Sequence, residues 1–391
     1  MEFARILKMF SPRIKILFVH SSLEYGGAED QRLTILKHIN RDKYDISICC
    51  LEKIGDIGKQ IEKMGFRVDC LNMPAKPYNI PTTFSLFRYL LKNRCDIVQT
   101  SLFATNFHGR IAAKLAGILH IISEEHSEHY QYTTVKSLPY IWADKILALF
   151  TDRIICCSKK VMDSISELEG LPRDKFQAIL SVVNFSKLEI TIDKKKMRYR
   201  LGLNDSDVVL GNIASISPRK GHVVLIKAFK LMRESLPSAK LVIAGNEDAN
   251  TKTGLLKLIK ELNLSKDIIF LGKQENLANV FNVMDIFILS SFIEGIPLAV
   301  IEAMYMNIPV IATDVGGLRE IIEDGETGII VPSNDPQAIA KAVQDLLSNP
   351  NKIANIVRDA KTSAIVRFVP QRYVSELEKC YGTIISNRLH K

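Results

Sequence analysis

The fold of this chain is decided by DIFILSSFIEGIPLAVIEAMYMNIPVIATDVGGLREIIEDGETGIIV, residues 285–331. Three short apolar runs, at 285–290, 309–313 and 328–332, have the length and β-branched content of buried strands. A helix is expected between the first two runs, starting at Pro297, because the fixed φ of proline suits the first helical position. Strand, helix and parallel strand form a βαβ unit, so this segment predicts a parallel sheet covered by helices.

The same alternation of short apolar runs and amphipathic helical patterns extends along most of the chain. It predicts further strands at 14–20, 44–51, 66–71, 96–100, 120–124, 152–158, 208–215, 239–245 and 267–272. The cysteine pairs at 49–50 and 156–157 fall in two of these runs, where we expect small buried hydrophobic residues. The predicted fold class is α/β, with two Rossmann-like, doubly wound parallel-sheet domains.

The length of 391 residues exceeds what one hydrophobic core supports, so two domains are expected. The pattern breaks in DKKKMRYRLGLNDSD, a charged stretch with turn residues, which indicates a linker near 185–206. We expect an N-terminal domain at 1–190, a C-terminal domain at 200–369, and a final helix at 370–391 that packs back on the first domain. Ligands of open parallel sheets bind beyond the carboxyl ends of the strands, so the expected site is a cleft between the domains.

Composition narrows the function classes. Hydrophobic residues at 47% and charged residues at 24% are typical of folded globular proteins. The seven cysteines lack metal-ligand spacing, and Asp205-Ser206-Asp207 precedes a strand as turn residues do, so we predict no metal. No run has the features of a signal peptide or the length of a spanning helix. These observations favour a reducing, cytoplasmic location.

The net charge of +9 lies entirely in the first half of the chain. Residues 1–200 hold 31 Lys and Arg against 22 Asp and Glu, whereas residues 201–391 hold 21 of each. This asymmetry indicates that the first half meets a membrane surface or a negatively charged substrate, although a solvated basic face is the simpler alternative. Basic residues near the N-terminus (Arg5, Lys8, Arg13, Lys15) add to a possible association with the inner face of the membrane, and no nucleic acid partner is expected.

The loop that precedes Pro297 has the features of an anion-binding site. It presents Glu294 and Gly295, and the N–H groups near Leu298 and Ala299 have no partners within the helix. A helix N-terminus beside a strand end favours bound anions, so we expect a phosphate there.

Glu294 and Glu302 can both face a ligand that lies along the start of this helix. Carboxylates accept hydrogen bonds from the paired hydroxyls of sugars and riboses, so two of them near a phosphate site favour a nucleotide sugar. The alternative is one partner for the helix dipole and one surface glutamate.

A second loop, after the strand at 208–215, carries Arg219 and Lys220 directly before Gly221 and a helix. A lysine point charge and a planar arginine fork suit a diphosphate. An exposed pair of cations on a solvated face would have the same sequence.

Two features of the first half also follow predicted strands. Gly26 and Gly27 come after the strand at 14–20, but GxGxxG and GxxxxGK[ST] are absent, which disfavours a dehydrogenase and a Walker loop. These glycines could make a turn or let backbone amides approach phosphate or an acceptor. His126 follows the strand at 120–124 and would project into the cleft; a structural histidine is the alternative.

We find a close resemblance to the donor-site signature of retaining GT-B glycosyltransferases of family 4 (glycosyl transferases group 1) in EGIPLAVIEAMYMNIPVIATDVGGLREIIEDGETGIIVP. Weaker matches are YGGAE at 25–29, EEHS at 124–127, CCSKKVMDSI at 156–165 and PRKGHVVLIKAF at 218–229. In order and spacing the resemblance spans roughly residues 14–385.

The resemblance implies that the domain at 1–190 binds the acceptor and that the domain at 200–369 binds the nucleotide-sugar donor. It also implies roles for individual residues. Glu302 would bind the ribose hydroxyls, Glu294 would lie by the donor sugar, and Lys220 would neutralise the diphosphate. His126 would touch the sugar near the reacting carbon, and Gly27 would offer backbone contacts at the phosphate or acceptor end. The donor-binding set would also include Arg219, Gly295, Ile296, Pro297 and Leu298.

Two positions depart from the family pattern. An arginine usual in the family is replaced by Ser215, and Arg219 could supply the missing charge. An Asn-Gly pair usual in the loop that closes the first domain is replaced by Asn184-Phe185. A phenylalanine disfavours positive φ and could reshape the hinge or the acceptor entrance.

The implied activity is a retaining, metal-independent transfer of a hexosyl-type sugar from a nucleotide diphosphate sugar to a glycan or lipid-linked acceptor, as in cell-surface polysaccharide synthesis. No cofactor is expected. The alternatives are a sugar phosphorylase or epimerase of the same architecture, and a non-catalytic nucleotide-sugar binding or assembly protein. The base, the sugar and the acceptor are not specified by these residues.

Overall fold

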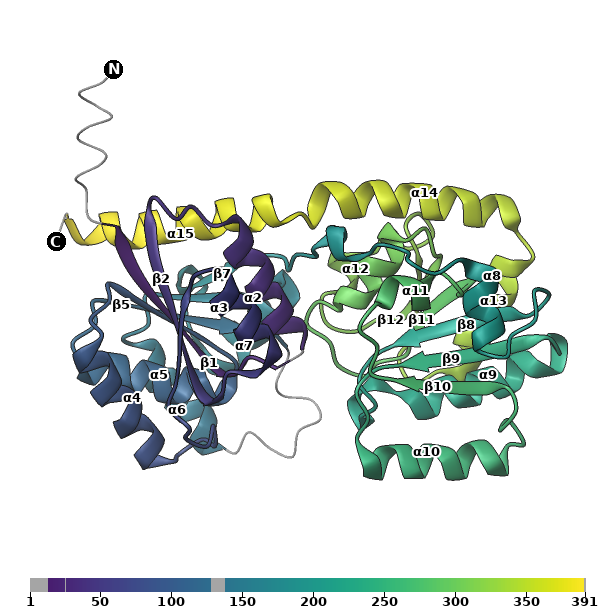
Figure 1. Ribbon diagram of the computed structural model, residues 1–391, viewed down its shortest axis with the longest axis horizontal. Helices are drawn as coiled ribbons and strands as arrows, with labels where there is room; N and C mark the ends of the chain where they lie inside the picture. The colour runs from purple at the N-terminus through teal and green to yellow at the C-terminus, as the bar shows by residue number, and fades with distance from the viewer. Residues whose placement is uncertain (1–12, 25, 128–137, 390–391) are drawn as a thin grey trace, which may run out of the picture. The chain divides into compact units, whose positions relative to one another are not determined.

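The computed structural model describes residues 13–24, 26–127 and 138–389 (Figure 1). Two residues noted in the sequence, Arg5 and Lys8, lie outside the described residues. The chain divides into two compact units. Unit 1 comprises Met1–His126, Val135–Leu180 and Pro370–Lys391, and unit 2 comprises Ser127–Thr134 and Ser181–Val369.

Unit 1 is built on a parallel sheet with the strand order β3-β2-β1-β4-β5-β6-β7. Its strands are β1 (Ile14–Ser22), β2 (Tyr44–Lys53), β3 (Arg67–Cys70), β4 (Ile97–Ser101), β5 (His120–Glu125), β6 (Arg153–Cys156) and β7 (Phe176–Ala178). Its helices are α2 (Gly27–His38), α3 (Gly55–Lys63), α4 (Ile80–Lys92), α5 (Phe103–Leu115), α6 (Leu138–Ala148), α7 (Lys159–Glu169) and α15 (Pro370–Leu389). The order of strands reverses between β1 and β4, which is where such sheets bind ligands.

Unit 2 has a parallel sheet with the order β10-β9-β8-β11-β12-β13. Its strands are β8 (Val208–Ile213), β9 (Ala239–Ala244), β10 (Ile268–Gly272), β11 (Ile286–Leu289), β12 (Val310–Thr313) and β13 (Ile329–Val331). Its helices are α8 (Lys194–Arg200), α9 (His222–Ser235), α10 (Ala249–Glu261), α11 (Leu277–Phe281), α12 (Leu298–Tyr305), α13 (Pro336–Leu347) and α14 (Pro350–Arg367). Here the switch point lies between β8 and β11.

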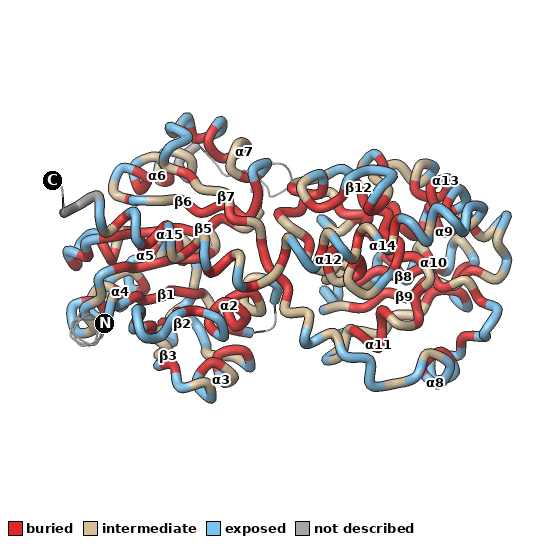
Figure 2. Tube along the Cα trace, turned by 90° about the horizontal axis from the view of Figure 1, so that it is seen from above, coloured by how far each residue is buried: buried red, intermediate tan, exposed pale blue. Residues whose placement is uncertain are grey.

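The two doubly wound parallel sheets confirm the predicted fold class, and all twelve predicted strands form. The central strands of each unit are buried and the edge strands β3, β10 and β13 are partly exposed, while the outer faces of the helices are exposed (Figure 2). The cysteine pairs at 49–50 and 156–157 are buried, as expected from their apolar runs. Strand β7 was not predicted, because its sequence, FQA, is not a continuous run of apolar residues.

Helix α12 begins one residue later than the sequence predicts. Pro297 is the N-cap with an extended backbone (φ −75°, ψ 105°), so Leu298 and not Pro297 is the first helical residue. Asn307, just beyond the C-terminus of the helix, has φ 58°. The N–H groups of Asn307 and Ile308 donate to the carbonyls of Met304 and Ala303, which completes a Schellman motif.

The segment expected to be a linker packs on unit 2. Arg198 of α8 is 5% exposed, and its guanidinium lies 2.7 Å from a carboxylate oxygen of Asp285. Phe185 opens a 3₁₀ turn (Phe185–Lys187), and its ring stacks on Tyr305 of α12 with centroids 4.3 Å apart. The phenyl group at the position of the expected glycine thus ties this segment to α12.

Helix α15 packs on α2 within unit 1, and its Tyr381 contacts the ring of Tyr44, the first residue of β2, edge-on with centroids 5.5 Å apart. None of the helices in the described part of the chain is long and apolar enough to cross a bilayer. Within the same residues, no cluster of three or more His, Cys, Asp or Glu side chains is arranged to hold a metal ion.

Candidate active site

Lys220 and Glu294 meet at the carboxyl ends of β8 and β11, at the switch point of the unit 2 sheet. Nζ of Lys220 lies 2.6 Å from Oε1 of Glu294, and the two side chains are only 13% and 8% exposed. The hydroxyl of Ser291 donates to the same carboxylate oxygen over 2.6 Å. The structure therefore brings together two of the residues that the sequence singled out, one cationic and one anionic, and adds Ser291.

Two glycines allow three loops to approach one another at this pair. Gly221 has φ 65°, and a Cβ there would lie 1.9 Å from the carbonyl oxygen of Ser290. Gly316 has φ 54°, and a Cβ there would lie 2.0 Å from the carbonyl oxygen of Glu294. Any larger residue would meet both a disfavoured backbone conformation and a backbone atom.

Hydrogen bonds between backbone groups join the same loops. The N–H of Phe292 donates to the carbonyl of Arg219, and the N–H of Gly317 donates to the carbonyl of Gly295, each over 2.8 Å. The hydroxyl of Thr313, at the end of β12, donates to the carbonyl of Ser291 over 2.6 Å. These hydrogen bonds join the loop backbones around Lys220 and Glu294. The side chain of Arg219 is exposed beside this pair.

The start of α12 adds backbone donors to this end of the sheet. Leu298 and Ala299 occupy its first turn, where N–H groups have no intrahelical acceptor. Gly295 and Pro297 are buried and Ile296 is half-buried, so the approach to the helix is packed. Glu302 lies at the start of the second turn and is half-buried.

His222 is the first residue of α9 and is 2% exposed. Burial, followed by the nearby charge of Lys220, lowers the pKa of His222 to about 4. The imidazole of His222 is therefore neutral near pH 7 and adds no positive charge next to Lys220.

In unit 1, His126 directly follows β5 with its side chain 17% exposed. Its Nε2 lies 3.0 Å from the hydroxyl oxygen of Ser101 and 3.4 Å from Oε2 of Glu124. Ser101 ends β4 and pairs in register with Glu124 on β5, so adjacent strands place both partners beside the imidazole.

Glu124 is the centre of a buried polar network that the sequence analysis missed. Its carboxylate is 2% exposed and forms an ion pair with Arg32 of α2. It also accepts hydrogen bonds from the amide of Gln99 and the hydroxyl of Ser101. Burial alone would raise the pKa of Glu124, but Arg32 and His126 outweigh it and the pKa is lowered, so the group is a carboxylate.

The network continues to β1 and to α15. Nε of Arg32 donates to Nε2 of His20 over 3.1 Å, and burial followed by the charge of Arg32 lowers the pKa of His20 to about 3. The hydroxyl of Tyr381 donates to Oε1 of Gln99 over 2.5 Å. The one sequence signal that could have pointed to this network is a carboxylate at the end of a buried strand, in SEE at 123–125.

Gly27 is the first residue of α2 and is exposed. Its neighbour Gly26 is the N-cap, in an extended conformation with no side chain to cap the helix. The predicted site residues therefore fall into two groups. Lys220, Arg219, Glu294 to Leu298 and Glu302 belong to unit 2, whereas His126 and Gly27 belong to unit 1.

Two family models match the chain. Residues 25–187 match the family described as Glycosyltransferase Family 4, and residues 193–363 match Glycosyl transferases group 1. Together the two matches span most of the chain, one in each half.

Relatives and solved structures cover nearly all of the chain. The chain is 25% identical to the UDP-Gal:alpha-D-GlcNAc-diphosphoundecaprenol alpha-1,3-galactosyltransferase of Escherichia coli, over 98% of this chain and 100% of that protein. It is 28% identical to the N-acetyl-alpha-D-glucosaminyl L-malate synthase of Bacillus anthracis, over 60% of each chain. The crystal structure of Anabaena Alr3699/HepE in complex with UDP-glucose has a similar fold, with a TM-score of 0.83, 21% identity, and coverage of 95% of this chain and 100% of that chain.

Proposed function

The chain belongs to family 4 of the glycosyltransferases (glycosyl transferases group 1) and has the GT-B fold, and on this premise we propose that it transfers a sugar from a nucleotide diphosphate sugar to a lipid-linked acceptor. We further propose that the transfer retains the anomeric configuration and needs no metal ion.

The observation that carries the donor site is the Lys220–Glu294 pair beside the start of α12. A cation and the N–H groups of Leu298 and Ala299 can bind the diphosphate, while carboxylates accept hydrogen bonds from sugar hydroxyls. When the diphosphate binds, Lys220 can be shared between Glu294 and a phosphate oxygen, because an ammonium group has three donors. Glu302 would then bind the ribose hydroxyls.

The proposed reaction needs stabilisation of the leaving diphosphate more than it needs a nucleophile. As the bond between the anomeric carbon and the diphosphate oxygen breaks, negative charge develops on that oxygen beside Lys220, Arg219 and the first turn of α12. The acceptor hydroxyl attacks the face that the diphosphate leaves, and the diphosphate takes the hydroxyl proton. His126 is proposed to contact the donor sugar near the reacting carbon.

The names of the relatives support the choice of donor and acceptor. The Escherichia coli relative is named for a UDP-galactose donor and a diphosphoundecaprenol acceptor, and the similar Anabaena structure contains UDP-glucose. We therefore propose a UDP-hexose donor and an acceptor on a lipid diphosphate. Such an acceptor suits a protein at the inner face of the membrane, with the basic first half toward the lipid.

The proposal is tested by thermal unfolding of the purified protein with UDP, GDP, ADP and their sugar conjugates, without added metal. A ligand at 100 times its dissociation constant stabilises the native state by about 2.7 kcal/mol. We expect stabilisation by the uridine nucleotides and its loss in Glu302→Ala. Incubation with UDP-hexose and a synthetic lipid diphosphate sugar, followed by NMR of the product anomeric proton, then tests transfer and retention. If no nucleotide stabilises the protein, the proposed donor site is wrong.

A further inference from the structure

Helix α4 of unit 1 carries an apolar stripe on its outer face. Ile80, Phe84 and Leu91 are 77%, 56% and 42% exposed, and their spacing of four and seven residues places them on one side of the helix. Leu86 and Leu90, on the inner side, are fully buried. The helix therefore has apolar residues toward the core and also toward solvent.

Helix α6 repeats this arrangement. Trp142 and Ile146 are 61% and 54% exposed, and Leu149, just after the helix, is 76% exposed. The spacing of four and three residues again defines one face. Between the two helices lies α5, whose last residue, Leu115, is 66% exposed.

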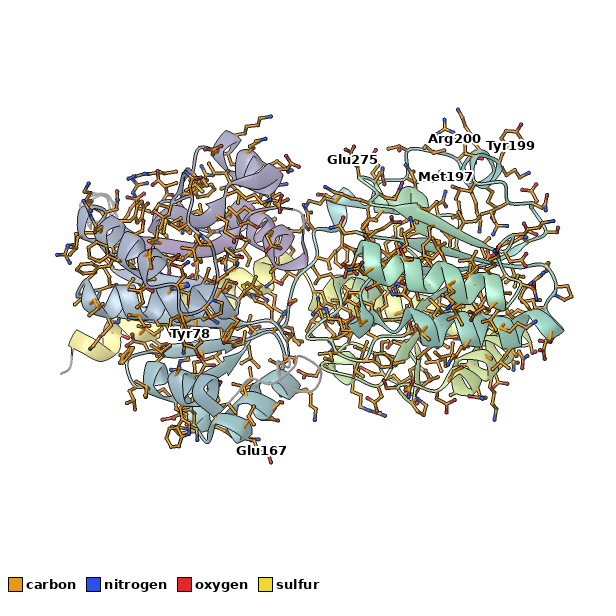
Figure 3. All side chains as sticks on the ribbon, turned by 90° about the horizontal axis from the view of Figure 1, so that it is seen from below. Tyr78, Glu167, Met197, Tyr199, Arg200 and Glu275 are labelled. Atoms are coloured by element: carbon orange, nitrogen blue, oxygen red, sulfur yellow. The ribbon has the colours of Figure 1, made fainter. Side chains whose placement is uncertain are left out.

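The three helices form one layer. α5 packs against α4 and against α6, and right-handed crossovers place all three on the same face of the parallel sheet (Figure 1). Tyr78, labelled in Figure 3, precedes α4 and packs edge-on against Phe107 of α5 with ring centroids 4.8 Å apart. The exposed apolar side chains are thus not scattered single residues but belong to adjoining helices.

Basic residues are interleaved with these apolar side chains. The guanidinium of Arg88 lies 6.0 Å from the ring of Phe84, Nζ of Lys145 lies 5.3 Å from the ring of Trp142, and Nζ of Lys114 lies 5.7 Å from the ring of Phe150. The sequences of α4, α5 and α6 contain a single acid, Asp144, which is 5% exposed and forms an ion pair with Arg110 over 2.6 Å. The outer face of the layer is therefore apolar and positive, with no acid exposed on these helices.

We propose that this layer is the surface by which the protein docks on an anionic lipid bilayer. We call it the α4–α6 patch, and it consists of Ile80, Phe84, Arg88, Leu91, Lys92, Lys114, Leu115, Trp142, Lys145, Ile146 and Leu149. Lysine and arginine extend their charged ends toward lipid phosphates while aromatic and aliphatic side chains enter the boundary between head groups and acyl chains. The interleaved charge favours an anionic bilayer over a protein surface. A protein partner needs acidic side chains at matching fixed positions, whereas the anionic head groups of a bilayer can move to meet the basic residues.

The inference rests on the proposed function for its purpose, because a lipid-linked acceptor is reached at a bilayer. Lipid binding by the patch needs neither donor nor acceptor, so it can be measured separately. The chain has one tryptophan, Trp142, and it lies in the patch. Its fluorescence reports only on this surface.

The first experiment mixes the full chain with vesicles of phosphatidylcholine, with and without phosphatidylglycerol. We expect co-sedimentation with the anionic vesicles, weakening as salt screens the charges. The emission of Trp142 should shift to shorter wavelength on binding and should be quenched by brominated lipid. Failure to bind anionic vesicles at low salt, or binding with unchanged emission, would overturn the proposal.

Paired variants test the patch itself. Phe84→Ser/Ile146→Ser should lower the vesicle partition coefficient at least tenfold, and Arg88→Glu/Lys145→Glu should do the same and remove the salt dependence. The matched control is Leu256→Ser/Val366→Ser, which changes apolar residues that are 47% and 67% exposed on helices of unit 2 and should bind as the wild type does. Patch variants that bind like this control would contradict the proposal.

Light scattering and nucleotide binding on the same proteins separate the other outcomes. A wild-type dimer that the Phe84→Ser/Ile146→Ser variant converts to a monomer would assign the patch to a second copy of the chain and overturn the lipid proposal. Thermal stabilisation by UDP should be equal in the wild type and both patch variants. Vesicle binding without a UDP response would contradict the proposed donor, while leaving the lipid surface supported.

Discussion

Replacing Lys220 by methionine tests the role of its charge in catalysis at the candidate donor site. The substitution keeps most of the length of the side chain and removes the charge beside the proposed leaving diphosphate. Loss of one preorganised donor at a developing anion typically lowers kcat by about 10²–10³-fold, or about 2.7–4 kcal/mol. We expect this loss in kcat for Lys220→Met.

The same substitution also has a structural cost that can be worked out from the contacts. Glu294 is 8% exposed and would keep only the Ser291 hydroxyl of its two donors named above. A hydrogen bond to a charged group contributes about 1.5–3 kcal/mol, so the free energy of unfolding should fall by that amount. In the double variant Lys220→Met/Glu294→Gln the carboxylate is gone and the amide still accepts from Ser291, so we expect stability to return to within about 1 kcal/mol of the wild type. Transfer should not return.

A matched control exists at the opposite end of the same sheet. Nζ of Lys240 lies 2.7 Å from a carboxylate oxygen of Asp267, with 20% and 11% exposure, near the amino ends of β9 and β10. Lys240→Met removes this pair far along the strands from the proposed site, where Asp267 keeps Arg233 as a second partner at 3.1 Å, and it should leave transfer unchanged. The assays are urea unfolding and transfer from UDP-hexose at saturating donor. Wild-type kcat in Lys220→Met, or recovery of transfer together with stability in the double variant, would refute the assigned role.

Three further predictions concern the surroundings of the two groups of site residues. Glu124→Gln leaves the buried guanidinium of Arg32 without its counter-charge, so urea unfolding should show a loss of about 3 kcal/mol, and an unchanged stability would contradict the network. Gly221→Ala puts alanine at φ 65°, which costs about 1–2 kcal/mol before any contact is counted, and should weaken UDP stabilisation, whereas Gly254→Ala, in open space on α10, should do neither. The pKa of His222 is about 4 in the folded protein and the usual 6.5 in the unfolded chain, so between these pH values the unfolded chain binds more protons. The stability that neutral His222 contributes is therefore present above pH 6.5 and is lost on acidification, by about 2 kcal/mol at pH 5. His222→Leu should lose that much less between pH 7 and 5, and equal losses in both proteins would contradict the assignment.

Most of the fold could be predicted because each strand is a short run of β-branched and aliphatic residues between turn signals. What could not be predicted depended on tertiary contacts. The segment 185–206 has the composition of a linker, yet Arg198 is buried because its guanidinium reaches Asp285, 87 positions later. Pro297 caps α12 and does not begin it, since its ψ is set by the loop packed before it.

The candidate site shows the same division. Position at strand ends pointed to Lys220 and Glu294, but their contact depends on β8 and β11 being neighbours in the sheet, which no local pattern specifies. Arg32 has the appearance of an exposed residue of an amphipathic helix, and its pairing with Glu124, 92 positions later, requires the strand order of unit 1. Charged residues are usually exposed, so sequence patterns alone do not identify the ones that are buried in pairs.

The network around Glu124 bears on why His126 is placed where it is. A buried ion pair gives little net stability, and apolar side chains of similar volume stabilise a core as well or better. Stability alone therefore does not account for Arg32, Gln99 and Ser101 converging on one carboxylate.

The arrangement does restrain the imidazole of His126, whose Nε2 faces both Ser101 and Glu124. A side chain that contacts a sugar near its reacting carbon gains from such restraint, because misplacement by a fraction of an ångström already slows a reaction. Tyr381 extends the restraint to α15 through Gln99, 282 positions earlier, so we infer that the last helix of the chain helps to orient a residue of the proposed site.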